Sequence, residues 1–248
     1  MGVTLSAAII GDHEPANPHH VATEAAIRHA ADARSAGVEI RWIDSVDISP
    51  ESAVDLAYYD CLVIAPGSPY RSMEGILRSV RVARETGIPM LGTCGGCQHI
   101  IIEFARNVMG FRDAAHAEYD PYASNLFVTP LSCSIVGQTM PVRLLDGSVA
   151  SKIYGREEVT EQYYCNFGLN PDHQEALDRA GLRIVGTDNA GEARVFAIED
   201  HPFFLATLFL PQSRSTSGRP HPIIASLLQA ATVRQARARE TAALPVAS

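Results

Sequence analysis

The chain has 248 residues, of which 46% are hydrophobic and 19% charged, a balance that is typical of a globular protein and excludes a disordered one. Its formal net charge of −8 excludes a nucleic-acid backbone or an anionic membrane as the main partner. The sequence starts without a basic region or a long apolar run, so we expect a cytoplasmic protein.

The first half of the chain alternates short apolar runs with amphipathic segments. Residues 20–36 have apolar side chains at near-helical spacing, and Gly37 is expected to cap that helix. The predicted strands are 4–10, 38–43, 61–65 and 90–92, and the predicted helices are 20–36, 73–86 and 95–108. This order predicts an α/β fold, with a doubly wound, mostly parallel sheet and helices on both faces.

The second half of the chain is richer in strands. We expect strands at 138–144, 183–187, 195–199 and 204–209, and a last helix at 221–239. No repeat or linker interrupts the sequence, so residues 1–240 are expected to form a single domain. The small, polar residues 241–248 are expected to form a flexible tail.

The five cysteines are scattered, unlike a disulfide framework. They are Cys61, Cys94, Cys97, Cys133 and Cys165. Cys94 and Cys97 form a CxxC, which is compatible with thioredoxin-like redox chemistry or with half of a zinc site. No second CxxC and no HxxxH accompanies it, so we expect neither a metal nor a cofactor.

Cys94 lies in a G-x-C-x-G sequence between a predicted strand and a predicted helix. This is the cysteine form of a nucleophile elbow. Side chains at Gly92 and Gly96 would clash with the neighbouring strand or helix, so glycine is needed there. The first amides of the helix favour a thiolate and can stabilise an oxyanion. A buried structural cysteine in a glycine-rich turn is the alternative, and the carboxyl end of a parallel strand favours the nucleophile.

Several blocks of the chain resemble class I glutamine amidotransferases, most closely the glutaminase domain of CTP synthase. The likeness extends from about residue 7 to residue 231 and implies a flavodoxin-like three-layer sandwich. No counterpart of the synthetase half is present, so we expect a stand-alone protein. The blocks are 59–67, 73–76, 84–89, 92–94, 102–110, 117–121 and 201–204.

The resemblance implies a role for individual residues. Cys94 matches the nucleophile that attacks the side-chain amide of glutamine. Gly67 and the amide of Gly95 fall where the oxyanion donors lie. Gln98 and Glu118 match substrate-binding residues, with Glu118 at the α-amino group; taken alone, Glu118 could equally be a solvated surface carboxylate.

Two family functions are missing from the sequence. The family's Gln-Phe-His-Pro-Glu motif aligns with 208–212, which places Leu210 at the general base and Gln212 at the acid that orients it. A leucine cannot accept a proton. Asn166 aligns with the arginine that holds the substrate carboxylate, and it cannot make that bidentate contact. The oxyanion loop at 66–69 is also one residue shorter than the family pattern.

Other residues are candidates for the lost base. His99 and His116 are the first candidates, beside Cys97, although a histidine one turn into an apolar helix is commonly structural. The loop after the first strand supplies further histidines that sequence alone does not rank. They are His13, His19 and His20.

We therefore expect a cysteine-dependent hydrolase or transferase that acts on a small amine-bearing substrate other than glutamine. One alternative is a residual glutaminase subunit that supplies ammonia to a synthetase partner. Another is a catalytically inactive binding or regulatory protein. A synthetase or a second copy of the chain is the expected protein partner.

Overall fold

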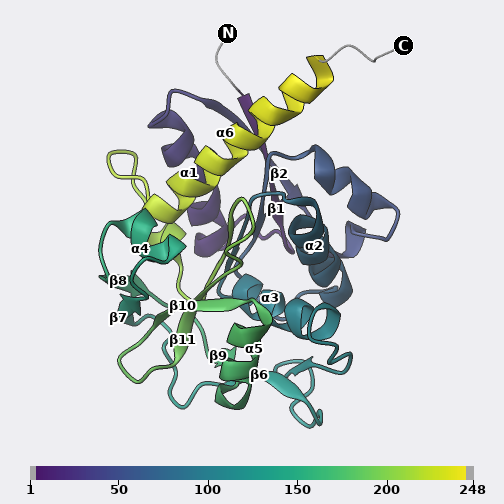
Figure 1. Cartoon of the computed structure of the whole chain (residues 1–248), viewed down its shortest axis with the longest axis vertical. Coiled ribbons are helices and arrows are strands. Elements are labelled where there is room, and N and C mark those ends of the chain that lie inside the picture. The colour runs from purple at the N-terminus through teal and green to yellow at the C-terminus, as the bar shows by residue number, and fades with distance from the viewer. Residues whose placement is uncertain (1–3, 244–248) are drawn as a thin grey trace.

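The computed structural model describes residues 4–243. Within this range, nine strands form a central sheet that is covered on both faces by helices (Figure 1). In spatial order the strands are β2 (Gly37–Ile43), β1 (Thr4–Ile10), β3 (Cys61–Ile64), β4 (Met90–Thr93), β12 (Phe204–Thr207), β11 (Ala193–Ala197), β10 (Arg183–Thr187), β7 (Thr139–Leu144) and β8 (Glu158–Gln162).

The sheet has a parallel half and an antiparallel half. Strands β2, β1, β3, β4 and β12 run parallel to one another. Strands β11, β10, β7 and β8 continue the sheet in antiparallel pairs. The crossovers of the parallel half place helices on both faces, which confirms the predicted doubly wound α/β class.

Helices α1 (Pro18–Asp32) and α6 (Pro222–Ala243) cover one face of the sheet, and α2 (Met73–Thr86) and α3 (Gly95–Asn107) cover the other (Figure 1). Alternate residues of β1 supply the two cores: Leu5 and Ile9 pack under α1 and α6, and Ile10 packs under α2 and α3. The shorter helices are α4 (Val149–Tyr154) and α5 (Gln174–Ala180), and the 3-10 segments are Ser45–Asp47, Ser52–Tyr58, Pro171–His173 and Pro211–Arg214.

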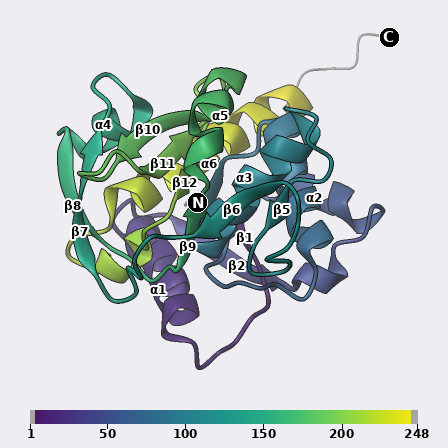
Figure 2. The same ribbon diagram turned by 90° about the horizontal axis from the view of Figure 1, so that it is seen from below.

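A second, three-stranded sheet lies beside α3 in the described range (Figure 2). Its strands are β5 (Ala115–His116), β6 (Leu126–Pro130) and β9 (Phe167–Leu169). This sheet brings the segment that carries Glu118 and the segment that carries Asn166 to the first turn of α3.

Several expected boundaries were wrong, among them the end of β12, which is Thr207 and not residue 209. Helix α1 ends at Asp32 with Ala33 as its cap; Ser35 takes the left-handed conformation (φ 52°), and Gly37 opens β2 instead of capping the helix. Strand β11 begins and ends two residues earlier than predicted; Ala193 pairs with Thr187 of β10, and Ala197 pairs with Leu205 of β12. Helix α6 extends to Ala243, into the expected tail, and residues 244–248 lie outside the described range. No helix between residues 4 and 243 is long and apolar enough to cross a membrane.

Candidate active site

Cys94 lies on a strained turn between β4 and α3. Its backbone has φ 52° and ψ −112°, a conformation that L-residues rarely adopt. Two hydrogen bonds hold it: the Cys94 amide donates to the Thr207 carbonyl at 2.9 Å, and the Gln98 amide donates to the Cys94 carbonyl at 3.2 Å. The cysteine therefore caps α3 from outside the helix, in the geometry of a nucleophile elbow.

Glycines around Cys94 allow the turn to be this tight. A Cβ atom on Gly92 would lie 2.5 Å from the Ile100 side chain, and one on Gly96 would lie 2.6 Å from the Ile64 carbonyl oxygen. A Cβ atom on Gly95 would lie 2.0 Å from the Gly67 carbonyl oxygen, so the two residues expected to serve the oxyanion are in direct contact. Each contact is closer than a side chain tolerates, which explains the run of glycines.

A pocket of about 240 Å³ opens beside Cys94 at the carboxyl edge of the parallel strands. Open α/β sheets place their sites at this edge. Five of the expected site residues line it, namely Gly67, Cys94, Gln98, Glu118 and Asn166, and so does Leu210. Its other lining residues are Asn17, His19, Pro66, Ser68, Val136, Tyr164, Cys165 and Phe167.

Gln98 and Glu118 are held in fixed orientations at the pocket wall. The Gln98 side-chain amide donates to the Phe167 carbonyl at 2.9 Å, and its oxygen accepts from Nε2 of His116 at 3.0 Å. The Ser68 hydroxyl donates to a carboxylate oxygen of Glu118. Glu118 is half-buried, so its negative charge faces the pocket rather than bulk solvent alone.

His99 and His116 are buried structural histidines. His99 donates from Nδ1 to the Gly95 carbonyl at 2.7 Å and accepts from the Tyr119 hydroxyl at Nε2, 2.9 Å away. His116 accepts the Glu118 amide at Nδ1 and donates from Nε2 to Gln98. Burial lowers the pKa of His99 to about 4 and that of His116 to about 3, so both rings are neutral. Neither lines the pocket, which weighs against their expected role as replacement bases.

Leu210 occupies the pocket wall where the resemblance places a histidine. Its side chain is 1% exposed, and its amide donates to the Gln162 carbonyl at 2.8 Å. Gln212, two residues on, is also buried and donates from Nε2 to the Thr93 hydroxyl at 3.1 Å. The Gln212 oxygen Oε1 is buried and has no hydrogen-bond partner among the described residues. A buried acceptor without a donor is uncommon, because it costs free energy.

Asn166 lines the pocket, and the resemblance places the family's arginine at this position. It is exposed, and its side-chain oxygen accepts from the Ser134 hydroxyl at 2.7 Å. Among the described residues that line the pocket there is no arginine and no lysine. The pocket thus presents a carboxylate from Glu118 and lacks a cation for a substrate carboxylate.

The structure ranks the three histidines of the first loop. His20 accepts the Glu14 amide at Nδ1 and donates from Nε2 to the Pro66 carbonyl, so it holds the oxyanion loop in place. His13 stacks on Trp42 with ring centroids 4.1 Å apart. His19 alone of the three lines the pocket, where its ring lies 4.5 Å from that of Tyr164. Burial and the neighbouring His20 lower the pKa of His19, which keeps its ring neutral at pH 7.

Sequence reasoning missed the part of the site formed by Tyr164 and Cys165. The Cys94 thiol lies 3.6 Å from the Tyr164 carbonyl oxygen, and Cys165 lines the same pocket. These residues adjoin Asn166, in the stretch that replaces the family's basic residues. In the sequence, the only sign of this part of the site was that Cys165 lies next to Asn166.

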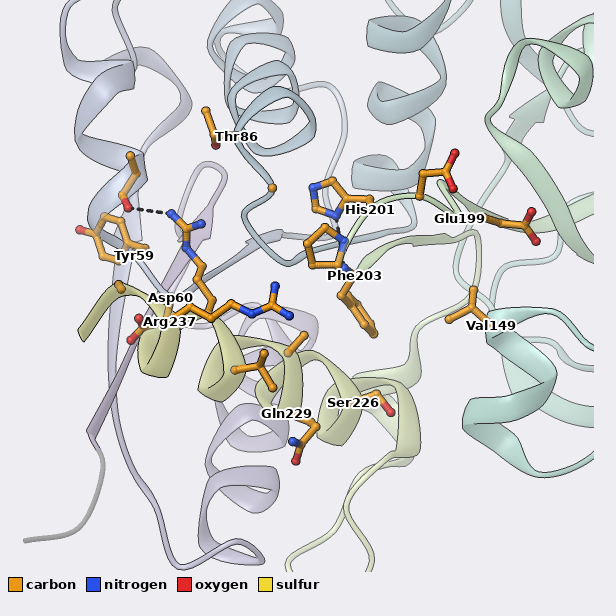
Figure 3. A pocket seen from close by; sticks show the side chains of 18 of the residues that line it. Tyr59, Asp60, Thr86, Val149, Glu199, His201, Phe203, Ser226, Gln229 and Arg237 are labelled. Carbon is orange, nitrogen blue, oxygen red and sulfur yellow. Dashed lines mark hydrogen bonds between the residues drawn. The ribbon is translucent and has the colours of Figure 1, made fainter. Parts of the chain in front are cut away.

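A larger groove of about 1060 Å³ lies at the opposite edge of the sheet (Figure 3). Asp60 and Phe203, which line it, immediately precede β3 and β12, so the groove borders the amino ends of the parallel strands. Its described lining includes His201 and Arg237 but no cysteine. The groove is larger than the pocket beside Cys94, but its described lining offers no thiol nucleophile, so the smaller pocket is the candidate active site. In the described part of the chain, no cluster of three or more His, Cys, Asp or Glu residues could hold a metal ion.

The elbow, its pocket and the fold define the class of this protein. Residues 20–230 match the family described as Glutamine amidotransferase class-I. The chain belongs to this family.

The curated relatives that this chain matches include several CTP synthases. CTP synthase of Pyrococcus furiosus is 33% identical over 239 residues, covering 92% of this chain and 44% of that protein. CTP synthase of Thermus thermophilus is also 33% identical, over 95% of this chain and 46% of that protein. The chain thus spans about half the length of the curated relatives it matches.

Solved structures agree with this placement. The glutaminase domain of Trypanosoma brucei CTPS with bound acivicin superposes with a TM-score of 0.86 and 26% identity, covering 92% of this chain and 94% of that one. A glutamine amidotransferase of Thermotoga maritima superposes with a TM-score of 0.56 at 10% identity, covering 93% and 97%, and supports the fold alone.

Proposed function

We propose that this protein is a cysteine-dependent hydrolase or transferase that acts on a small amine-bearing substrate other than glutamine. The observation that carries the proposal is the composition of the pocket. It keeps the strained nucleophile Cys94, while a buried leucine occupies the place of the base and no cation is present for an α-carboxylate.

The substrate class follows from the charge and volume of the pocket. About 240 Å³ accommodates a compact molecule, and Glu118 offers a carboxylate to an ammonium group. A glutamine bound there would leave its own carboxylate without a charged partner, because Asn166 is neutral. Small amides or esters that carry an amine and no carboxylate therefore suit the pocket better.

In the proposed reaction, the Cys94 thiolate attacks the substrate carbonyl and forms a tetrahedral oxyanion. The amides of Gly95 and Gly67 are the proposed donors to that oxyanion. Collapse breaks the bond to the leaving group, and water or a second amine then releases the acyl group from the cysteine.

His19 is the proposed proton carrier of this reaction. It is neutral at pH 7 and lines the pocket, whereas His99 and His116 have both ring nitrogens engaged. A neutral imidazole can take the Cys94 thiol proton by way of water, and the imidazolium so formed can then protonate the leaving amine. The neutral ring that results can activate the water that hydrolyses the thioester. We expect His19→Asn to lower turnover by about 100-fold, which is the ordinary loss for a general acid–base residue.

A residual glutaminase subunit that supplies ammonia to a synthetase partner is the second candidate. It is favoured by the coverage of the relatives, since the matched CTP synthases are about twice as long as this chain. A binding or regulatory protein without turnover is the third, favoured by the burial of Leu210 at the base position.

The test is a turnover assay on glutamine and on a panel of small aminoalkyl amides and esters, with Cys94→Ser as the control. We expect little ammonia from glutamine and Cys94-dependent turnover of at least one panel compound. Robust glutamine turnover that is lost in Cys94→Ser would favour the glutaminase subunit. No turnover and no mass adduct on Cys94 with any compound would favour the binding protein.

A further inference from the structure

We propose that Cys94 and Cys165 form a redox pair, in which a hydroperoxide oxidises Cys94 and the Cys165 thiol then closes a reversible disulfide. The proposal rests on the proposed nucleophilic role of Cys94 and adds a second reaction at the same sulfur.

Three backbone contacts bring the two cysteines together. The Cys94 amide donates to the Thr207 carbonyl at 2.9 Å, and the Cys165 thiol donates to the carbonyl of the next residue, Leu208, at 3.2 Å. The Cys94 thiol in turn lies 3.6 Å from the carbonyl oxygen of Tyr164, the residue bonded to Cys165. Both cysteines line the same pocket.

The sheet separates Cys94 from the other cysteine of the CxxC. Cys94 and Cys165 pack against the core under α1 and α6. Cys97 is fully buried in the core on the opposite face, among the residues under α2 and α3. The helical turn from Cys94 to Cys97 therefore directs the two side chains to different sides of the sheet, and Cys165 is the better placed partner.

The proposed chemistry requires that a peroxide reach Cys94 more easily than Cys165, and the exposure of the two cysteines differs in this direction. Cys94 is half-buried and open to the pocket, whereas Cys165 is 2% exposed. Burial, together with the nearby Cys94, raises the pKa of Cys165 well above its ordinary value. A peroxide thus meets Cys94 first, and Cys165 stays protonated until it attacks.

The two steps balance in atoms and electrons. The Cys94 thiolate attacks one oxygen of the hydroperoxide, the O–O bond breaks, and Cys94 sulfenic acid and an alcohol (water, for hydrogen peroxide) are formed. The Cys165 sulfur then attacks the sulfenic sulfur; an S–S bond forms, the S–OH bond breaks, and the hydroxide leaves as water with the Cys165 proton. An external thiol restores both thiols by exchange.

The experiment treats the full-length protein with hydrogen peroxide, blocks free thiols and maps tryptic peptides without reduction. Trypsin yields 85–106, which carries Cys94 and Cys97, and 157–179, which carries Cys165. We expect these two peptides to be cross-linked, with the loss of two hydrogens, and to separate after dithiothreitol. The Cys97→Ser variant should give the same cross-link, which assigns it to Cys94.

The Cys165→Ser variant tests the resolving role. Without a second thiol, Cys94 should proceed to sulfinic acid, and we expect at least about tenfold more of this product than in the unmodified protein. If Cys165→Ser fails to fold, the Cys97→Ser map alone decides the pairing.

Two results would overturn the redox pair alone, and a third would overturn both proposals. One is a cross-link within 85–106 that disappears in Cys97→Ser, which would show that Cys97 is the partner. The other is a Cys94 that peroxide oxidises without forming a cross-link, while iodoacetamide labels the same cysteine rapidly in the untreated protein. This result would exclude the redox pair and leave the proposed hydrolase unaffected. A Cys94 that reacts with neither reagent would contradict both proposals.

Discussion

Leu210 and Gln212 lie where the resemblance places the general base and the acid that orients it. The unpaired Oε1 of Gln212 lies in the interior, although a buried acceptor without a donor costs about 1–3 kcal/mol. The Gln212 side-chain amide donates a hydrogen bond to the hydroxyl of Thr93, the residue before Cys94. The segment that carries Leu210 and Gln212 is therefore tied directly to the turn that carries Cys94.

Restoring both side chains should give Cys94 a titrating neighbour. In Leu210→His with Gln212→Glu, the imidazole should lie beside Cys94 and be oriented by the carboxylate. The rate of Cys94 alkylation should then gain a new pH dependence in the range where histidine titrates. Unchanged alkylation rates from pH 5 to 9 in a folded double variant would mean that Leu210 does not face the nucleophile.

Adding Asn166→Arg to that double variant should improve glutamine binding. A guanidinium at this position can pair with the α-carboxylate in a bidentate geometry, which Asn166 cannot. A charged hydrogen bond of this kind corresponds to a KM for glutamine lower by about tenfold or more. Asn166→Gln in the same background is the matched control and should leave KM unchanged; an equal improvement in both would contradict the charge argument.

At the scale of elements, the elbow depends on close approach between β3 and α3. A Cβ atom on Gly96 would lie 2.6 Å from the Ile64 carbonyl oxygen and 2.9 Å from the Ile64 Cβ. We expect Gly96→Ala to lower the free energy of unfolding by about 1–3 kcal/mol, because backbone has to move. Gly218→Ala, with nothing within 4 Å, should change it by less than about 0.5 kcal/mol in urea unfolding. Equal losses of stability in the two variants would mean that the turn can accommodate a Cβ atom at Gly96.

An ion pair fastens α2 to α3 behind the elbow. Arg84 donates to both carboxylate oxygens of Glu103, at 2.8 and 3.1 Å, and the Glu103 side chain is 1% exposed. Arg84→Met should cost about 3–5 kcal/mol of stability, because it leaves a buried carboxylate without its cation.

Arg81→Met is the matched control for that change. Arg81 pairs with Glu85 on the same helix, but both side chains are about half exposed, so the expected loss is at most about 0.5 kcal/mol. Urea unfolding measures both variants. A loss for Arg84→Met as small as that for Arg81→Met would show that Glu103 is solvated rather than held by Arg84.

Elements with a strong local pattern were predictable from the sequence. Strand β1 and helix α2 occur with the predicted bounds, because a continuous apolar run and a Ser72-capped amphipathic helix depend little on distant residues. The small sheet of β5, β6 and β9 was not predicted. Its strands are two to five residues long, and they exist because residues 115–116 and 167–169 both pair with 126–130.

The candidate site was predictable where the family motif marks it and not elsewhere. Cys94, Gln98 and Glu118 were identified from blocks of sequence, and the pocket brings them together. His19 and Cys165 belong to the same pocket but come from segments 146 residues apart, so only tertiary structure ranks them. His99 and His116 were candidates for the base because they lie close in sequence to Cys94 and Glu118. Both are buried and do not line the pocket.

At the scale of the whole molecule, buried histidines make the fold sensitive to mild acid. The pKa values of about 4 for His99 and about 3 for His116 lie below the ordinary 6.5, so the unfolded chain takes up protons first as the pH falls. The free energy of unfolding should decrease from pH 6.5 to pH 5, by up to about 1.4 kcal/mol per pH unit for each histidine. His116→Gln should reduce that slope by about one proton in urea unfolding. An unchanged slope would contradict the buried neutral state of His116.

The most direct measurement of the central claim compares the five cysteines in one competitive alkylation. Limiting iodoacetamide at neutral pH, followed by peptide mass spectrometry, ranks their reactivity. If exposure alone decided the order, the exposed Cys133 would react first and the half-buried Cys94 would follow. A nucleophile elbow at a helix N-terminus predicts the reverse, with Cys94 labelled before Cys133 and the buried Cys61, Cys97 and Cys165 last. Labelling of Cys133 or Cys61 ahead of Cys94 would contradict the assignment of Cys94 as the nucleophile.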